Sequence, residues 1–204
     1  LLEIGCGSGD ALHAMQKLGW CVTGLDFDVH AVDHARKRGL DVRLGKLADQ
    51  GFAEKHYDAV VMSHVIEHIP SPAQLLAKCR SLLKKNGILV VRTPNAISRL
   101  HMHYGRNWRG LEAPRHLQVF SPKSLADIAV NSGFRNIETF TSMMGFVYQH
   151  LASQDLARGF KHVMGGRIAF YRRFLSHFRA ASLGWRKIWR RSDDGVELVL
   201  ICRK

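Results

Sequence analysis

The sequence predicts an α/β fold, with a mostly parallel β-sheet covered by helices on both faces. Apolar runs of strand length alternate with longer amphipathic segments through the first half of the chain. These runs are almost continuously apolar, as in strands of a parallel sheet that are buried on both faces. Three glycines at alternate positions, Gly5, Gly7 and Gly9, follow the first run and permit a tight turn from a strand into a helix.

The first half of the chain alternates between strands and helices. We expect strands at residues 1–5, 20–26, 41–45, 57–63 and 87–93, and helices at 9–18, 28–38 and 72–85. The helix at 72–85 has the clearest start, because Ser71 is able to cap it and Pro72 suits its first position. Gln74 completes a capping box with Ser71, and Gly87 lies just beyond the expected end.

The second half adds fewer elements. A second Ser-Pro pair predicts a helix that begins at 121–122, and a strand follows it at 134–141. A last strand is expected at 196–202, and the segment before it, at about 145–191, is interpreted as a basic helical insertion. Neither a repeat nor a linker interrupts the pattern, so residues 1–204 are interpreted as a single domain.

The composition is that of a globular protein with a sizeable core, since 46% of the 204 residues are hydrophobic. No apolar run reaches the roughly 18 residues of a membrane span. The cysteines, Cys6, Cys21, Cys79 and Cys202, occur singly, which favours reduced thiols in a cytoplasmic protein. Because the chain begins at Leu1, inside the first expected strand and without a Met, we interpret it as N-terminally truncated.

The net charge of +13 is interpreted as a property of the insertion, because residues 158–191 contain many cations and no acid. Large apolar residues, among them Phe160, Phe170 and Trp185, are interleaved with these cations. Such a basic amphipathic stretch binds an anionic membrane surface, which would place the protein at the membrane periphery, or a nucleic acid. Alternatively, it is a solvated helical face whose apolar side packs on the core.

The glycine turn favours a particular kind of ligand. Asp10 stands where a dinucleotide-binding fingerprint has its third glycine, and its charge opposes a pyrophosphate at that helix start. A cationic or zwitterionic cofactor therefore suits this position better. The second expected strand ends at Asp26, whose carboxylate is able to accept both hydroxyls of a ribose.

Together these features resemble the class I S-adenosylmethionine-dependent methyltransferases. The resemblance is carried by Glu3 with the three glycines, by Asp26, by Tyr57-Asp58, and by His64-Val65-Ile66-Glu67-His68-Ile69-Pro70. It covers about residues 1–142 and the last strand. It implies a Rossmann-like sheet of seven strands, with the last strand antiparallel and inserted beside the fifth. It also implies S-adenosyl-L-methionine as the cofactor and S-adenosyl-L-homocysteine as its product.

The resemblance assigns cofactor binding to Glu3, Gly5, Cys6, Gly7, Gly9, Asp26, Phe27, Leu47 and Ser63. The backbone of the glycine turn faces the methionine and ribose, Asp26 binds the ribose hydroxyls, and Phe27 packs on the adenine. Glu3 is expected to brace the glycine turn through backbone N–H groups. An alternative role for Asp26 is to cap the next helix. Lys46 stands where many relatives have an acid that accepts from the adenine, which leaves the backbone of Leu47 to contact that edge.

A second constellation follows the fourth expected strand. His64, Glu67 and His68 stand at spacing i, i+3, i+4, which places them on one face of a helical turn. They resemble the E-x-x-E-H segment of quinone-biosynthesis O-methyltransferases and small-RNA 2′-O-methyltransferases, which helps to bind a divalent metal there. In this chain His64 replaces the first acid, and His116 is the candidate fourth ligand. Without a metal, Glu67 orders the loop and His68 acts as general base, so all four residues are catalytic candidates.

A third segment, residues 104–116, follows the fifth expected strand, where open α/β sheets bind ligands. A similar stretch occurs in a broad group of bacterial methyltransferases. Trp108 and Arg109 in this segment either contact a polar acceptor or pin the loop to the core, for example through a cation–π contact.

The function favoured by the sequence is transfer of a methyl group from S-adenosylmethionine to an oxygen of a small, glycan-linked or lipid-linked acceptor. Two alternatives stay open. The net charge and the metal-like cluster fit an RNA 2′-O-methyltransferase, although the cations flank many large apolar residues. The other alternative is a non-catalytic scaffold that binds the cofactor and works through its basic segment.

Overall fold

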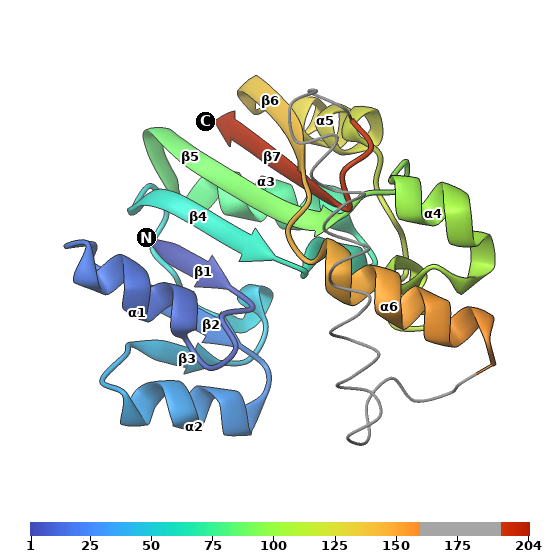
Figure 1. Cartoon of the computed structure of the whole chain (residues 1–204). Helices are drawn as coiled ribbons and strands as arrows, with labels where there is room; N and C mark the ends of the chain where they lie inside the picture. The colour runs from blue at the N-terminus through green and yellow to red at the C-terminus, as the bar shows by residue number, and fades with distance from the viewer. Residues whose placement is uncertain (160–192) are drawn as a thin grey trace.

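The computed structural model describes residues 1–159 and 193–204. In these residues a seven-stranded sheet has the order β3-β2-β1-β4-β5-β7-β6 (Figure 1). Its strands are β1 (Leu2–Ile4), β2 (Thr23–Asp26), β3 (Val42–Leu44), β4 (Tyr57–Ser63), β5 (Leu83–Pro94), β6 (Arg135–Ser142) and β7 (Glu197–Arg203). The first five run parallel, and β7 is antiparallel to its neighbours β5 and β6. The expected fold class is thereby confirmed.

Helices lie on both sides of this sheet, as Figure 1 shows for α1 in front and α3 behind. The helices are α1 (Asp10–Lys17), α2 (Val29–Lys37), α3 (Pro72–Leu82), α4 (Arg99–Tyr104), α5 (Pro122–Asn131) and α6 (Phe146–Ala157). Short 3₁₀ turns are η1 (Leu47–Asp49), η2 (Ile66–His68), η3 (Gly105–Asn107) and η4 (Arg109–Leu111).

The main core lies between the sheet and the helices α3 and α5. On one face of β4, β5 and β7, alternate side chains are completely buried: Val60, Met62, Leu89, Val91, Leu198 and Leu200. Leu76 of α3 and Leu125 of α5 belong to the same apolar cluster. A smaller cluster joins α1 and α2 to β3, through Leu12, Val32 and Val42. Because these side chains are closely packed, the sheet is rigid, and the loops that follow its strands begin at fixed positions.

The third helix begins at Pro72 as expected, but the expected capping box and the expected end at 85 were wrong. Ser71 makes no side-chain cap hydrogen bond, and its backbone (φ −123°, ψ 76°) differs from that of Ser121, whose hydroxyl forms a reciprocal capping box with Ser124. At the other end, Leu83 begins β5 because it pairs with Tyr57 of β4. Residues that were expected to extend the helix therefore extend a strand.

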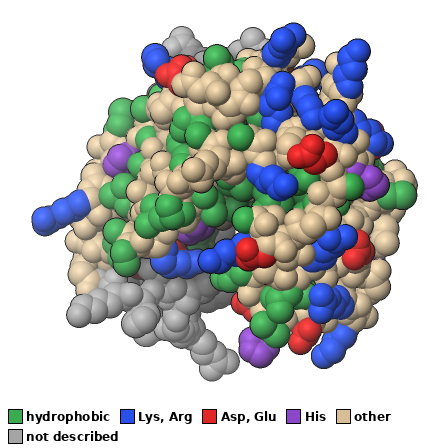
Figure 2. Space-filling view, turned by 180° about the vertical axis from the view of Figure 1, so that it is seen from behind, with side chains coloured by type: hydrophobic (Ala, Val, Ile, Leu, Met, Phe, Trp, Pro, Cys, Tyr) green, Lys and Arg blue, Asp and Glu red, His purple; other side chains and the backbone are tan. Residues whose placement is uncertain are grey.

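The insertion expected at about 145–191 begins as α6, while residues 160–191 lie outside the described residues, and with them most of the basic stretch. Positive charge is also present elsewhere, since Figure 2 shows Lys and Arg side chains gathered on one face of the described residues. Within the part of the chain that the structure describes, no helix is long and apolar enough to cross a membrane.

The helices α4 and α6, with the turns η3 and η4, form a cap beside the ends of β4 and β5 (Figure 1). Its centre is Trp108, which is 1% exposed and packs with Leu100. The Trp108 ring stacks on His101 at 4.6 Å, and its Nε1 donates to Gln149 Oε1 at 3.2 Å. Arg109 pairs with a glutamate instead of lying over an aromatic ring, so Trp108 pins the loop without the expected cation–π contact.

Candidate functional site

The predicted site residues gather at one edge of the sheet. The glycine turn follows β1 at this edge, and Ser63, the last residue of β4, lies opposite Arg92 of β5. Because β7 runs antiparallel, its first residue, Glu197, reaches the same edge opposite Pro94. Ligands of open α/β sheets bind outside such carboxyl ends.

The glycine turn has the backbone that its sequence predicts. Gly5, Gly7 and Gly9 all have positive φ, at 73°, 51° and 79°. The Gly5 and Cys6 N–H groups donate to the carbonyl of Leu25, at 2.7 and 3.2 Å, which ties the turn to β2. A Cβ at Gly7 would meet no atom within 4 Å, so the space above this residue is open. The turn is therefore open at Gly7, while Gly5 and Gly9 are enclosed.

Asp26 joins the end of β2 to the glycine turn. Its Oδ2 accepts from the Gly7 N–H at 2.8 Å, and its Oδ1 accepts from the Asp28 N–H at 2.9 Å. Asp26 does not cap α2, because that role belongs to Asp28, which accepts from the His30 and Ala31 N–H groups. Each Asp26 oxygen retains a second lone pair, which suits two ribose hydroxyls.

The remaining adenosine-side candidates lie around Asp26. Phe27 is 80% exposed, as expected of an apolar ring that lacks a protein partner. Leu47 is buried in η1, and the exposed Lys46 precedes it. The hydroxyl of Ser63 accepts from Arg92 Nε at 2.9 Å, so this candidate already has a partner.

Glu3 does not brace the glycine turn in the expected way. It is 7% exposed, and within the described residues its Oε2 has no hydrogen-bond partner. Burial raises the pKa of Glu3 to about 7, an effect that Arg92 opposes and Asp26 reinforces. The turn is braced instead by Asp26 and by Arg38, whose Nη1 donates to the Ser8 carbonyl at 2.9 Å.

We expect Gly5→Ala to destabilise the fold more than a glycine substitution in an open turn does. The added Cβ would lie 2.4 Å from Val65 Cγ2, in addition to the strain of a positive φ. The strain alone costs about 1–2 kcal/mol, and each kcal/mol lowers Tm by roughly 2–4 °C for a chain of this size. Gly19→Ala is the matched control, because its φ is +90° and its Cβ would meet nothing. Thermal unfolding that lowers both Tm values equally would contradict the enclosed position of Gly5.

His64 occupies a different position from the one expected. Its Nδ1 lies 3.2 Å from Glu67 Oε1, and its Nε2 lies 3.2 Å from Glu197 Oε1. The carboxylates of Glu197 and Glu67 raise the pKa of His64 to about 9. Both ring nitrogens of His64 therefore face carboxylates, and its role as a catalytic residue or metal ligand stays a prediction.

The residues that the structure brings together are Glu67, His68 and His116. Their ligand atoms all lie within 4.8 Å of one another, and the rings of His68 and His116 meet edge to face at 4.7 Å. His68 Nδ1 lies 2.8 Å from the Arg115 carbonyl, and His116 Nδ1 lies 2.7 Å from the Gly110 carbonyl. Since a carbonyl only accepts, both Nδ1 atoms donate, and Nε2 is the nitrogen that remains on each ring. The Nε2 of His116 also lies 3.6 Å from Glu112 Oε2.

Two charged residues of this edge were missed by the sequence analysis. Glu197 is buried at the start of β7, and Arg92 Nε lies 3.6 Å from its Oε2. Each adjoins an apolar run, residues 88–91 before Arg92 and residues 198–202 after Glu197. A charge that adjoins such a run is the signal that could have identified them.

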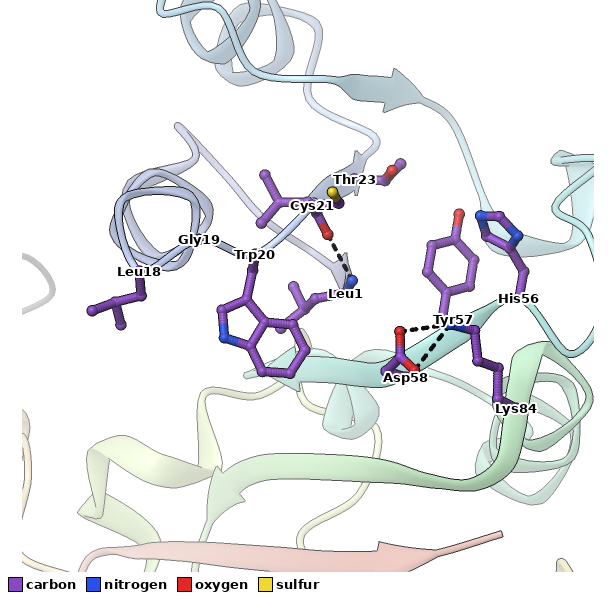
Figure 3. A pocket seen from close by; sticks show the side chains of 11 residues that line it. Leu1, Leu18, Gly19, Trp20, Cys21, Thr23, His56, Tyr57, Asp58 and Lys84 are labelled. Atoms are coloured by element: carbon purple, nitrogen blue, oxygen red, sulfur yellow. Dashed lines mark hydrogen bonds and ion pairs between the residues drawn. The ribbon is translucent and has the colours of Figure 1, made fainter.

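The cavity drawn in Figure 3 lies elsewhere, at the amino ends of β1 and β4. It has a volume of about 490 Å³, and Leu18, Trp20 and Tyr57 line it beside the Asp58–Lys84 ion pair. None of the predicted site residues lines this cavity. It therefore takes no part in the candidate site.

Residues 1–139 match the family described as "Methyltransferase domain". This chain belongs to that family. Among similar proteins, the ubiquinone biosynthesis O-methyltransferase of Caulobacter vibrioides is 36% identical over 121 residues, or 53% of this chain and 48% of that protein. The Histophilus somni enzyme of the same name is 33% identical over 106 residues, or 47% of this chain and 44% of that protein. The methyltransferase-domain chain thus spans about half the length of the curated relatives it matches.

Solved structures show the same fold. A SAM-dependent methyltransferase from Archaeoglobus fulgidus has a TM-score of 0.67 at 20% identity and covers 100% of this chain and 85% of its own. Phosphoethanolamine N-methyltransferase 2 of Haemonchus contortus, in complex with S-adenosyl-L-methionine, has a TM-score of 0.65 at 18% identity, with coverage of 100% and 48%. At these identities the likeness shows the fold alone. The resemblance to class I methyltransferases is confirmed at the level of family and fold.

The residues at the carboxyl edge fit the cofactor of this family. Within the described residues, the buried Glu3 Oε2 has no hydrogen-bond partner, and the ring of Phe27 is exposed. The space above Gly7 is open. Asp26 retains lone pairs for a ribose. These groups are acidic, polar and aromatic, and so match an aminoacyl sulfonium joined to an adenosine.

Proposed function

We propose that this chain transfers a methyl group from S-adenosylmethionine to a hydroxyl oxygen of a small or lipid-linked acceptor. The observation that carries the proposal is the cluster of Glu67, His68 and His116, whose ligand atoms all lie within 4.8 Å of one another. The names of the most similar curated relatives, ubiquinone biosynthesis O-methyltransferases, support an oxygen acceptor.

The cofactor, when bound, supplies an electrophilic methyl group on a sulfonium. In the proposed arrangement Asp26 holds the ribose hydroxyls, the glycine turn lies against the methionine portion, and Phe27 covers the adenine. The chain's own contribution is mainly orientation of donor and acceptor, because methyl transfer needs the two in line and shielded from water.

His68 is the proposed general base. Its Nδ1 hydrogen bond to the Arg115 carbonyl fixes the tautomer in which Nε2 accepts a proton. An acceptor hydroxyl at Nε2 would lose its proton to His68 as the oxygen attacks the methyl group. His116 and Glu67 line the same spot and orient the acceptor.

A metal-assisted version is favoured by the same cluster. Two imidazole Nε2 atoms and one carboxylate are ligands that Zn²⁺ and similar ions accept. In that version the three side chains would hold the ion, which would lower the pKa of the acceptor hydroxyl in place of a base. His64 lies against Glu67 and Glu197, so the proposal assigns it to neither set.

Radiolabelled methyl transfer tests the proposal, with 3,4-dihydroxybenzoate, a short-tailed isoprenoid quinol and a short RNA as acceptors. We expect label on the phenolic oxygen of one of the first two, unchanged by a chelator. Loss of activity with a chelator, restored by a metal, would assign Glu67, His68 and His116 to an ion. Label on the RNA alone would favour the nucleic-acid alternative. No label on any acceptor, with the cofactor bound, would favour a scaffold.

A further inference from the structure

Glu197 makes a contact that no sequence motif predicts. It is 5% exposed, and its Oε1 lies 3.2 Å from His64 Nε2, a residue 133 positions earlier in the chain. It also stands close to the cap, because a Cβ on Gly145, which precedes α6, would lie 3.5 Å from the same oxygen. One carboxylate therefore links the last strand to the loop after β4, and it lies near the start of α6.

His64 completes a bridge between two buried carboxylates. Its Nδ1 faces Glu67 Oε1 at 3.2 Å, on the opposite side of the ring from Glu197. The imidazole thus stands between the two carboxylates, with one ring nitrogen within hydrogen-bond distance of each.

The backbone of His64 is held in an uncommon conformation. Its φ is +55°, in the left-handed region that a residue with a Cβ seldom adopts. The His64 N–H donates to the Arg92 carbonyl at 2.8 Å, and the two carboxylates hold the ring. Such a conformation persists only where its surroundings determine it strongly, as at functional sites.

The bridge continues into the acceptor side of the site through Glu67. Glu67 is completely buried, and its Oε2 accepts from Thr93 Oγ1 at 3.0 Å. Its backbone carbonyl accepts from the Leu117 N–H at 2.9 Å, directly after His116. A displacement of Glu67 would therefore displace the segment that presents His116.

Glu197 also faces a second cation. Arg92 Nε lies 3.6 Å from Glu197 Oε2, but it donates to Ser63 Oγ at 2.9 Å instead. Within the described residues Glu197 Oε2 has no hydrogen-bond partner. The negative charge of Glu197 thus lies between His64 and Arg92, and its removal would leave both with less compensation.

We propose that Glu197 is a positioning residue: its contact with His64 holds the imidazole as the bridge to Glu67, and Glu67 in turn holds the segment that carries His116. The catalytic consequence of this role rests on the proposed function. The existence of the bridge does not depend on the proposed function, so an experiment is able to contradict one and leave the other standing.

Glu197→Gln tests the bridge, because it preserves shape and removes the charge. We expect the ¹⁵N NMR signals of the His64 ring to shift in the variant, because Nε2 loses its carboxylate partner. S-adenosylhomocysteine affinity should change less than about twofold, since Asp26 is untouched. With an acceptor from the transfer assay, kcat should fall about tenfold while the KM for the cofactor stays constant. A tenfold change in rate corresponds to the interaction energy typical of two side chains in contact.

Glu138→Gln, at an exposed position of β6, is the matched control and should change none of these quantities. A second variant, His64→Gln, removes the bridge from its centre and should accelerate amide exchange at Leu117, even where Glu197→Gln does not fold. The kcat of the double variant, with both Glu197→Gln and His64→Gln, should equal that of the less active single variant. Unchanged His64 ring signals in Glu197→Gln, or independent effects in the double variant, would overturn the proposal.

Discussion

Asp26→Ala is expected to lower the affinity for S-adenosylhomocysteine at least about 100-fold, because each hydrogen bond to a charged group contributes roughly 1.5–3 kcal/mol. Asp26 would lose two bonds to the ribose, and the Gly7 N–H would lose its 2.8 Å partner. The glycine turn would then be both unbraced and without its ribose anchor. Isothermal titration calorimetry measures the effect without an acceptor.

Asp28→Ala provides the matched control for Asp26, since the two acids are two positions apart. Asp28 caps α2 through the His30 and Ala31 N–H groups, and among the described residues its side chain makes no hydrogen bond to the glycine turn. Loss of such a cap costs about 1 kcal/mol of stability. We expect a lower Tm and an affinity within twofold of the original chain. Equal losses of affinity in both variants would contradict a specific role for Asp26.

His68→Gln is expected to lower kcat by about 10²–10⁴, the range that a general base contributes. Gln keeps a donor for the Arg115 carbonyl but lacks a basic nitrogen in the place of Nε2. The affinity for S-adenosylhomocysteine should stay within twofold, because the cofactor residues lie on β1 and β2. Turnover with the acceptor identified above, at saturating cofactor, is the measurement.

His30→Gln is the control for His68, because His30 is exposed on α2, away from the carboxyl edge of β4. It should retain full turnover. A His68→Gln variant as active as this control would remove His68 from the mechanism. Rescue of His68→Gln by a small imidazole in solution would further support its role as a base.

The sequence predicted best those features that depend on neighbours along the chain. The strand at 57–63 was placed correctly at both ends, because its apolar run is long and bounded by turn residues. The glycine turn followed from the spacing of its glycines. The end of α3 was wrong, since Leu83 leaves the helix to pair with Tyr57, a preference that depends on the sheet rather than on helix propensity.

The electrostatics of the site could not be predicted, because they depend on residues far apart in sequence. The i, i+3, i+4 spacing placed His64 with His68 and Glu67, but Glu197 captures the second nitrogen of His64 from the last strand. Similarly, Arg38 and Asp26 brace the glycine turn that Glu3 was expected to brace. A periodic pattern indicates which side chains lie on the same face of one element. It carries no information on charged partners from distant parts of the chain.

Titration of S-adenosylhomocysteine into the purified chain by calorimetry tests the central claim most directly. The claim is that the carboxyl edge formed by the glycine turn and Asp26 binds this cofactor. The account predicts one site with micromolar affinity, abolished in Asp26→Ala and retained in His68→Gln. Absence of binding to the folded chain, or equal binding to the Asp26→Ala variant, would contradict it.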